Sequence, residues 1–389
     1  MQLETLQFVF VSILLCGLSI PTHSLTLPTD IAALADFKSA ITSPASRRLS
    51  CLSTWNFTAS DPCDFPCGIS CIRSSDTNRY SRIIAITLDP AGYSGLLPAS
   101  LANLTALQHL DLSSNAFLSR IPGSLFTLPS LKTLVLASNS FTGPIPASLV
   151  KASALQKLDL SRNSITGSVP LFLSSLSSLT TLDLSYNRLT GSIPDTLPPN
   201  LVELALRGNS MTGFLKQSTF APLGSIQVIE LAENRLQGKL QSWFFLLPSL
   251  QQVDLSNNSF TGISVQSPTA SNTNQLVAID LGFNKIKGTL PVQLAQFGSL
   301  VAISLRHNAL TGPVPAEYCM AKMGMGFRRL FLDGNFLSGE VPQGFFEIKD
   351  FVGSFGDNCL ERCPHSMAFC SPAQKPQSIC KRKQHANWF

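Results

Sequence analysis

The sequence predicts an α/β solenoid, a right-handed curved superhelix with a parallel β-sheet along its concave face and a cap at each end. Three observations predict this fold. One short motif recurs along most of the 389 residues, its apolar residues alternate as they do in a strand, and a cluster of cysteines lies on either side of the series. With 44% hydrophobic and only 13% charged residues, the composition excludes an intrinsically disordered protein.

Residues 1–24 are typical of a secretory signal peptide. Phe8–Ile20 is an apolar run, and Thr22 and Ser24 supply the small residues that precede a cleavage site. An uncleaved membrane anchor is the alternative, but a membrane-spanning helix needs about 20 apolar residues. Removal of the segment takes away Glu4 and leaves a net charge of 28 − 22 = +6, which favours acidic partners or anionic cell-wall polysaccharide.

The rest of the chain has no predicted membrane span, because no later stretch holds 18 consecutive apolar residues. The longest aromatic and apolar cluster, Trp243–Leu247, ends at Pro248. The sequence therefore predicts a secreted protein without a transmembrane anchor, located outside the cell at the cell wall or cell surface.

The recurring motif is "LDLSSNAFLSRIP" (Leu110–Pro122), which returns as "LDLSRNSITGSVP" (Leu158–Pro170) and "LDLSYNRLTGSIP" (Leu182–Pro194). It recurs about every 24 residues, which predicts eleven stacked units over residues 83–357. The first unit is centred on Ala91, and one asparagine marks each of the others: Asn115, Asn139, Asn163, Asn187, Asn209, Asn234, Asn258, Asn284, Asn308 and Asn335.

The alternating residues of each unit predict a short strand with one buried face. Leu110 and Leu112 are expected in the core, and Asp111 and Ser113 on the solvent side. No single unit can bury its own apolar face, so the units must stack around one continuous core. The Asn amide both donates and accepts hydrogen bonds, so these side chains are expected to form a ladder that satisfies backbone groups where each strand bends inward.

The return segment of each unit carries Gly in "LTG" for a tight bend and Pro in "IP" to end regular pairing. Lys216, Gln241 and Val265 stand where three units lack this proline, so the convex side is expected to be less regular there. Before the repeats, Asp30–Ile41 has apolar residues on one helical face, and Thr29 is a candidate N-cap for that helix.

The cysteines predict a disulfide cluster at each end of the chain. The two clusters are Cys51, Cys63, Cys67 and Cys71, and Cys359, Cys363, Cys370 and Cys380. Zinc is the alternative for the first cluster because its spacings are short, but secretion favours disulfides. Cys319 stands alone between the clusters, either as a free or crosslinking thiol or as a half-buried inert side chain.

The motif L-x-x-L-x-L-x-x-N-x-L-T-G-x-I-P resembles the plant-type leucine-rich repeat, and the resemblance covers nearly all of the chain after residue 24. Leu52–Cys71 is also similar to the N-terminal cap of that family, through Trp55, Cys63, Gly68 and Cys71. The resemblance implies a leucine-rich-repeat superhelix with an N-terminal cap over residues 25–82 and a cysteine-rich C-terminal cap with a basic tail over residues 358–389.

The N-terminal segment departs from the family at one point. The second tryptophan of the family's cap is missing, and Pro66 and Cys67 lie in its place. An extra disulfide is therefore expected to replace the usual aromatic plug. The resemblance favours the pairs Cys51–Cys67 and Cys63–Cys71 among the three connectivities that four cysteines allow, and the pairing at the C-terminal end stays open.

The resemblance implies a non-catalytic recognition protein, like a receptor-like protein or receptor-kinase ectodomain, that binds a peptide or protein ligand in cell-surface signalling or defence. A membrane receptor kinase is a candidate partner. Only 389 − 335 = 54 residues follow Asn335, too few for a kinase domain. The alternative is an inhibitor of cell-wall-degrading enzymes, similar to polygalacturonase inhibitors. A structural wall protein is disfavoured because the chain has no Pro-rich or low-complexity segment.

An enzyme is not expected. The four histidines after residue 24 (His109, His307, His365 and His385) fall in no catalytic or metal-binding motif. No cofactor, metal or nucleic-acid partner is predicted.

The concave sheet is the expected binding face, and two patches on it stand out from the aspartates that the family often carries there. The C-terminal patch comprises Phe283, Arg306, His307, Arg328, Arg329 and Phe331, and the central patch comprises Lys157, Arg162, Tyr186 and Arg207. Arg and aromatic residues anchor interfaces, and Arg can hold a peptide carboxylate through two hydrogen bonds. An ion pair between Arg306 and Asp333 is the structural alternative. Arg162 and Tyr186 are expected to form a cation–π contact.

Three N-x-S/T sequons predict glycosylation, at Asn56, Asn103 and Asn257. A glycan on Asn257 would cover part of the concave face.

Overall fold

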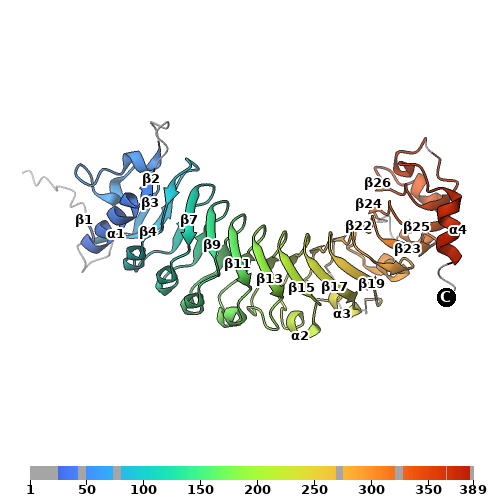
Figure 1. The fold of residues 1–389 in the computed structure, drawn as a ribbon, viewed down its shortest axis with the longest axis horizontal. Helices are drawn as coiled ribbons and strands as arrows, with labels where there is room; N and C mark the ends of the chain where they lie inside the picture. Colours follow the sequence, from blue (N-terminus) through green and yellow to red (C-terminus); the bar gives the residue numbers. More distant parts are fainter. Residues whose placement is uncertain are drawn as a thin grey trace, which may run out of the picture.

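The computed structural model describes residues 25–42, 50–72, 80–268, 275–319, 327–364 and 366–385. They form a long arc of stacked coils with helix α1 (Pro28–Ser39) near one end and helix α4 (Gln377–His385) at the other (Figure 1). The predicted curved solenoid with a parallel sheet and disulfide-containing ends is confirmed. The predicted signal peptide and the end of the basic tail lie outside the described residues.

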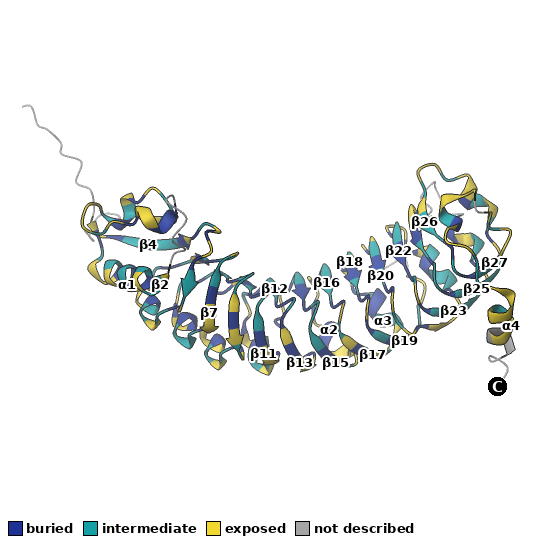
Figure 2. Cartoon of the chain, turned by 45° about the horizontal axis from the view of Figure 1, so that its top comes forward, coloured by how far each residue is buried: buried dark blue, intermediate teal, exposed yellow. Residues whose placement is uncertain are grey.

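A fourteen-stranded sheet runs along the inner side of the arc (Figure 2). Its strands are β1 (Leu25–Thr26), β3 (Ile69–Ile72), β4 (Tyr80–Thr87), β6 (His109–Asp111), β8 (Thr133–Val135), β10 (Lys157–Asp159), β12 (Thr181–Asp183), β14 (Glu203–Ala205), β16 (Val228–Glu230), β18 (Gln252–Asp254), β20 (Ala278–Asp280), β22 (Ala302–Ser304), β24 (Arg329–Phe331) and β26 (Val352–Ser354). Neighbouring strands are parallel, except that β3 runs antiparallel to β4.

The register of this sheet confirms the predicted alternation. Strands β10 and β12 align Leu158 with Leu182 and Asp159 with Asp183. Both leucines are fully buried, whereas both aspartates remain partly exposed on the concave side. The position four residues before each ladder asparagine therefore forms one continuous column across the sheet.

Two further sheets follow the return segments. The longer has nine strands: β2 (Ile41–Thr42), β5 (Ser94–Gly95), β7 (Ala116–Arg120), β9 (Ser140–Gly143), β11 (Ser164–Ser168), β13 (Arg188–Ser192), β15 (Ser210–Gly213), β17 (Arg235–Leu240) and β19 (Ser259–Ile263). The shorter has β21 (Lys287–Gly288), β23 (Ala309–Gly312), β25 (Phe336–Glu340) and β27 (Cys359–Glu361).

The convex side of the coils is built mainly from short 3-10 helices that begin directly after the repeat proline, and further 3-10 helices lie in the two caps. The 3-10 helices span Cys51–Thr54, Pro62–Asp64, Ala99–Asn103, Gly123–Thr127, Ala147–Lys151, Leu171–Ser175, Val292–Gln296, Ala316–Tyr318, Gln343–Phe346 and Ala368–Cys370. Where Lys216 and Gln241 replace the proline, short α-helices follow instead, α2 (Gln217–Phe220) and α3 (Ser242–Phe245). The irregularity predicted at these two coils is confirmed.

The asparagine ladder is present as predicted. In a typical rung, Oδ1 of Asn139 accepts from the backbone N–H of Phe117 at 2.9 Å, and Nδ2 donates to the carbonyls of Leu112 and Leu136 at 2.9 and 3.2 Å. The ladder continues one rung beyond Asn335, the last asparagine that the motif search found. Oδ1 of Asn358 accepts from the N–H of Leu337 at 3.1 Å, so the solenoid has a further coil containing β26 and β27.

The apolar side chains form one continuous core along the solenoid, and the buried residues are dark blue on the ribbon in Figure 2. Most coils contribute a buried leucine, isoleucine or valine from the inner strand, and phenylalanines also pack in the core. Phe117 and Phe141 stack with ring centroids 6.4 Å apart, and Phe220 meets Phe244 edge to face at 5.9 Å. This shared core gives every coil apolar neighbours on both sides.

Helix α1 opens the N-terminal cap, and its start differs from the prediction. The helix begins at Pro28 with Leu27 as N-cap and no capping side chain, so the assignment of Thr29 as N-cap is wrong. Proline fixes a helical φ and lacks the N–H that a cap would satisfy, so it can occupy the first helical position itself. Asp30 is fully buried and accepts from Nε of Arg82 at 3.0 Å.

The pairs Cys51–Cys67 and Cys63–Cys71 are both present, as the resemblance implied. The expectation that a disulfide replaces the aromatic plug is wrong, because the plug persists beside it. Trp55 is fully buried and stacks on Phe65 with centroids 6.1 Å apart, so Phe65 supplies the second ring.

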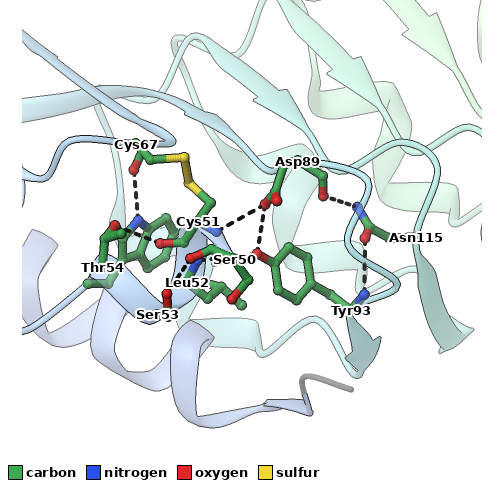
Figure 3. The surroundings of a disulfide bond; sticks show 10 residues. Ser50, Cys51, Leu52, Ser53, Thr54, Cys67, Asp89, Tyr93 and Asn115 are labelled. Carbon is green, nitrogen blue, oxygen red and sulfur yellow. Dashed lines mark hydrogen bonds between the residues drawn. A yellow bond between two sulfur atoms is a disulfide. The ribbon is translucent and has the colours of Figure 1, made fainter. Parts of the chain in front are cut away.

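A tyrosine joins this cap to the first coil (Figure 3). The hydroxyl of Tyr93 donates to Oδ1 of Asp89 at 2.7 Å and accepts from the N–H of Leu52 at 3.2 Å. The N–H of Cys51 donates to the same carboxylate at 3.3 Å. Burial of the ring raises the pKa of Tyr93, so the phenol keeps its proton and the contact.

The C-terminal cap closes the other end of the core. Its disulfides are Cys359–Cys380 and Cys363–Cys370, which resolves the pairing that the sequence left open. The ring of Phe355 packs between Phe345 and Phe369, with centroids 5.2 and 5.5 Å away. Throughout the described part of the chain, no helix combines the length and apolar character needed to cross a bilayer.

Candidate functional site

The candidate site is a hollow of about 280 Å³ on the concave sheet, over strands β16 to β24. These strands lie side by side in register, so their outward side chains form rows across the sheet. The hollow is lined by Val228, Ile229, Glu230, Gln252, Val253, Asp254, Ala278, Ile279, Asp280, Ala302, Ile303, Ser304, Arg306, Arg329 and Phe331. Acidic groups occupy one end, and cationic and aromatic groups the other.

The acidic end is formed by Glu230, Asp254 and Asp280 on successive strands. Desolvation, followed by the charge of Asp254, raises the pKa of Glu230. Arg207 reaches into this end from the preceding coils, and its guanidinium lies 3.1 Å from Asp254 and 2.5 Å from Glu233. The hydrogen bonds that Arg207 donates to Glu233 raise the pKa of Arg207, which keeps the guanidinium charged.

Arg306, Arg329 and Phe331 of the predicted C-terminal patch line the other end of the hollow. Phe283 and His307 lie beside it without lining it. The rings of Phe283 and His307 stack with centroids 4.4 Å apart. The guanidinium carbon of Arg306 lies 5.8 Å from the ring centre of Phe283 and 5.3 Å from that of Phe331. Arg306 is therefore held between two aromatic rings, within the range of cation–π attraction.

The ion pair considered between Arg306 and Asp333 does not form. Oδ2 of Asp333 instead lies 3.5 Å from Nε2 of His307. That alternative is wrong because the carboxylate of Asp333 faces the imidazole of His307, and the guanidinium of Arg306 lies between two aromatic rings. Within the ranges that the structure describes, Arg306 has no carboxylate partner.

The two remaining arginines of the C-terminal patch are placed differently. Arg329 begins strand β24 and lines the hollow. Arg328, one residue earlier and before the strand begins, is exposed but does not line it. The patch at the hollow thus has two arginines, Arg306 and Arg329, rather than three.

The aromatic side chains reach the concave face because of an unusual backbone conformation. Tyr186, Phe283 and His307 each precede a ladder asparagine and have φ values of 53°, 55° and 51°. This left-handed region is disfavoured for residues with a Cβ, so the stacked coils must hold it in place. The rings of Tyr186 and His307 then lean over the next coil, where Gly208 and Gly334 leave room for them, and the ring of Phe283 stacks on His307.

The structure also brings together part of the predicted central patch. The guanidinium carbon of Arg162 lies 4.5 Å from the centre of the Tyr186 ring, which confirms the expected cation–π contact. Arg207 approaches the same ring at 5.9 Å. Lys157 lies on β10. Desolvation raises the pKa of the nearby Asp183 carboxyl, and the charge of Lys157 acts in the opposite direction. Because Arg207 is committed to two carboxylates, this patch offers fewer free cations than the C-terminal one.

Sequence reasoning missed two features of the hollow. Ser304 is only 6% exposed, and its hydroxyl has no hydrogen-bond partner among the described residues. Glu230 and Asp280 were treated as ordinary members of a column of acidic residues, whereas they flank a carboxylate already neutralised by Arg207. The period of the repeat placed Ser304, Glu230 and Asp280 on the concave face, but the sequence gives no signal for which polar groups there have a partner.

The other predicted positions lie on the surface or in the caps. Asn56, Asn103 and Asn257 are exposed, which glycosylation requires, and it stays a prediction at all three. Cys319 is the free cysteine of the described chain, half-buried, and burial raises the pKa of its thiol. No group of acidic, His or Cys side chains in the described ranges is arranged to hold a metal ion.

Family models match this chain over both the cap and the repeats. The leucine-rich-repeat N-terminal domain matches residues 27–72, the leucine rich repeat matches residues 105–165 and 199–260, and a two-copy leucine-rich-repeat model matches residues 153–198. Among curated proteins, Receptor-like protein 7 of Arabidopsis thaliana is 34% identical over 146 residues, which are 37% of this chain and 14% of that protein.

Three solved structures resemble the fold. The PEPR1–AtPEP1 complex matches with a TM-score of 0.73 at 30% identity, covering 86% of this chain and 46% of that one. The plant peptide hormone receptor RGFR1, in complex with RGF2, matches with a TM-score of 0.64 at 28% identity, covering 72% and 45%. A plant ice-binding protein matches with a TM-score of 0.65 at 25% identity, covering 90% of this chain and 99% of its own.

The chain therefore spans about a seventh of its curated relative and under half of each receptor chain. The matched ranges cover the N-terminal cap and the repeats between residues 105 and 260. The chain belongs to the leucine-rich-repeat proteins, of the type found in plant receptor-like proteins and receptor ectodomains.

Proposed function

We propose that this chain is a non-catalytic extracellular recognition protein that binds a peptide or protein ligand on its concave face, in cell-surface signalling or defence. The observation that carries the proposal is the hollow over β16 to β24, where Arg306 and Arg329 lie beside Phe331. Arginine and aromatic side chains are the residues that most often anchor interfaces, and guanidinium groups can bind a carboxylate through two hydrogen bonds.

The solved relatives support a peptide as the ligand, since RGFR1 is a peptide hormone receptor in complex with RGF2. The hollow is elongated across several parallel strands, which suits an extended chain better than a compact small molecule. A membrane receptor kinase is a candidate partner for signalling, and the net positive charge of +5 favours a further association with anionic cell-wall polysaccharide.

The test is to incubate the purified protein with peptides from plant extracellular fluid, wash, and identify the retained peptides by mass spectrometry. The variant Arg306→Ala/Arg329→Ala removes both cations of the hollow. The matched control, Lys239→Ala/Lys287→Ala, removes two exposed cations from the lateral sheets and leaves the hollow intact. Retention of defined peptides by the wild type and the control, but not by the hollow variant, is expected.

The same experiment separates the inhibitor alternative. If the wild type retains no peptide but slows a purified polygalacturonase, and the arginine variant slows it equally, the chain acts as an enzyme inhibitor through another surface. Direct measurement of pectin hydrolysis in the presence of each variant gives this answer. Binding to pectin alone would not, because a basic recognition protein and an inhibitor could both show it.

Ice binding is a second candidate, favoured by one specific surface. The lateral sheet carries exposed hydroxyl groups on neighbouring strands, with Ser168 opposite Thr190 and Ser192 opposite Thr212. Strands in a sheet lie about 4.8 Å apart, so these hydroxyls form a regular polar array. Thermal hysteresis of the purified protein, abolished by Thr190→Lys, would favour this candidate; its absence would remove it.

A further inference from the structure

Within the described part of the chain, two carboxylates of the hollow form no ion pair. Asp254 pairs with Arg207, but neither Glu230 nor Asp280, on the strands to either side, forms an ion pair with a residue in the described ranges. Oδ1 of Asp280 accepts only the backbone N–H of Gly282, at 2.8 Å. Both side chains are partly buried, and for Glu230 desolvation and the nearby charge of Asp254 raise the pKa.

A buried hydroxyl lies between these carboxylates and the arginines. Ser304, on the strand after Asp280, lines the hollow and is 6% exposed, and its Oγ has no hydrogen-bond partner within the described chain. An unpaired buried hydroxyl is uncommon, since it loses its bonds to water without compensation. It can donate to or accept from a ligand placed in the hollow.

Gly282 brings the two charged ends of the hollow together at this point. A Cβ on Gly282 would lie 3.1 Å from Oδ1 of Asp280, 3.2 Å from Oγ of Ser304 and 3.1 Å from Cγ of Arg306. A carboxylate oxygen, a hydroxyl and the stem of a cation thus converge closely around the backbone of Gly282. The guanidinium of Arg306 is turned away, between its two aromatic rings, instead of neutralising Asp280.

The spacing of the two charged ends follows from the strand register. Asp280 lies two strands before Phe331, and Glu230 two strands before Asp280. With about 4.8 Å between strands, the middle of the acidic end lies roughly 10–14 Å from the two arginines. An extended peptide advances about 3.3–3.5 Å per residue, so three or four residues cover this distance.

We infer that the hollow selects a peptide segment in which a lysine or arginine side chain and a carboxylate lie three or four residues apart. The basic side chain lies against Glu230 and Asp280, the carboxylate lies against Arg306 and Arg329, and the intervening peptide backbone meets the hydroxyl of Ser304. This inference rests on the proposed function and names the ligand chemistry of that same site. The segment crosses the strands, with its basic residue toward the N-terminal cap.

The inference can be tested with a displayed library of random heptapeptides that have a free C-terminus, selected on the folded protein. The acidic end is neutralised by Glu230→Gln/Asp280→Asn, and a matched control, Glu317→Gln/Glu361→Gln, removes two exposed charges elsewhere. Circular dichroism and thermal unfolding first establish that each variant folds. The wild type and the control are expected to enrich peptides with a basic residue three or four positions from an acidic residue or the C-terminal carboxylate.

The strongest selected peptide is then synthesised in two forms, with its basic residue and with glutamine in that place. Wild-type affinity is expected to fall about tenfold with the glutamine form, and the acid-neutralised variant should bind both forms equally. Ser304→Ala should weaken both forms alike. Binders that depend on Arg306 and Arg329 but show no preference for a basic residue would overturn the inference and leave the proposed function standing. Failure to select any peptide on the concave face would overturn both.

Discussion

The carboxylate of Asp333 faces the imidazole of His307, with Oδ2 3.5 Å from Nε2. This contact decides the character of the hollow's cationic end, because it directs Asp333 away from Arg306. The imidazole also stacks on Phe283, so it is fixed from two sides. A guanidinium that would otherwise be neutralised within the protein is thereby left facing the concave side with two aromatic neighbours.

The place of His307 depends on Gly334, which gives the first prediction. A Cβ at Gly334 would lie 2.5 Å from Nδ1 of His307, and the glycine has φ +73°. Gly334→Ala should therefore destabilise the protein by about 2 kcal/mol or more and displace the imidazole from Phe283. Chemical denaturation measures the first effect, and the loss of ligand binding measures the second.

Gly288→Ala is the matched control for this substitution. Gly288 also has a positive φ, +98°, but no atom lies within 4 Å of its Cβ position. The control carries the backbone strain alone and should unfold at a lower denaturant concentration than wild type but a higher one than Gly334→Ala. Equal destabilisation by both variants would mean that the contact with His307 is unimportant.

The second prediction concerns the asparagine ladder. Nδ2 of Asn163 donates to the carbonyls of Leu136 and Leu160 at 2.9 and 3.1 Å, and Oδ1 accepts from the N–H of Phe141 at 3.0 Å. Asn163→Leu leaves these backbone groups unpaired and should lower the free energy of unfolding by about 1–3 kcal/mol. Asn200→Leu, at an exposed position outside the ladder, should change it far less.

The repeat made most of this architecture predictable from the sequence. A strict alternation of buried and exposed residues, repeated with an asparagine at a fixed place, determines both the register of the inner sheet and the columns on its surface. For this reason the contact between Arg162 and Tyr186 could be expected from spacing alone, and the structure places the two groups 4.5 Å apart. Asn358 was missed because the residues around it keep the spacing of the motif but few of its letters.

The choice of ion-pair partners could not be predicted in the same way. Asp333 occupies the same repeat position as Arg306 one coil later, yet it pairs with His307, because side-chain directions that the repeat period does not encode decide the partner. Arg207 pairs with Glu233, in the following coil, and with Asp254, two coils away. The start of α1 was also mispredicted. Thr29 is a residue type that favours the N-cap position, but the helix already begins at Pro28.

The third prediction concerns the N-terminal disulfide Cys51–Cys67. It joins cysteines 16 residues apart and holds the segment that contacts Asp89 and Tyr93 (Figure 3). Cys51→Ala/Cys67→Ala should lower the free energy of unfolding by about 3 kcal/mol, as expected for a closed loop of this length. Cys319→Ala, which removes the free thiol instead, should leave it nearly unchanged. A similar loss in both variants would indicate that packing of the sulfur atoms, not the crosslink, is responsible.

The last prediction uses the raised pKa of Glu230. Its carboxyl is desolvated and lies near Asp254, so the folded protein holds the proton at a pH where the unfolded chain has released it. The ordinary pKa of a glutamate is about 4.3. When the folded state has a higher pKa, the free energy of unfolding falls as the pH rises from that ordinary value through the folded one. Glu230→Gln should therefore stabilise the protein at neutral pH, by less than about 1 kcal/mol because the side chain is partly exposed to solvent.

The gain from Glu230→Gln should vanish below about pH 4, where the wild-type carboxyl is protonated in both states. Thermal unfolding of both proteins between pH 3 and pH 8 measures this difference directly. Glu233→Gln is the contrasting variant, since it removes a carboxylate that Arg207 already neutralises, and it should destabilise the protein at neutral pH. If Glu230→Gln also destabilises the protein, then the carboxylate has a stabilising partner and is not held in the hollow for a cationic ligand.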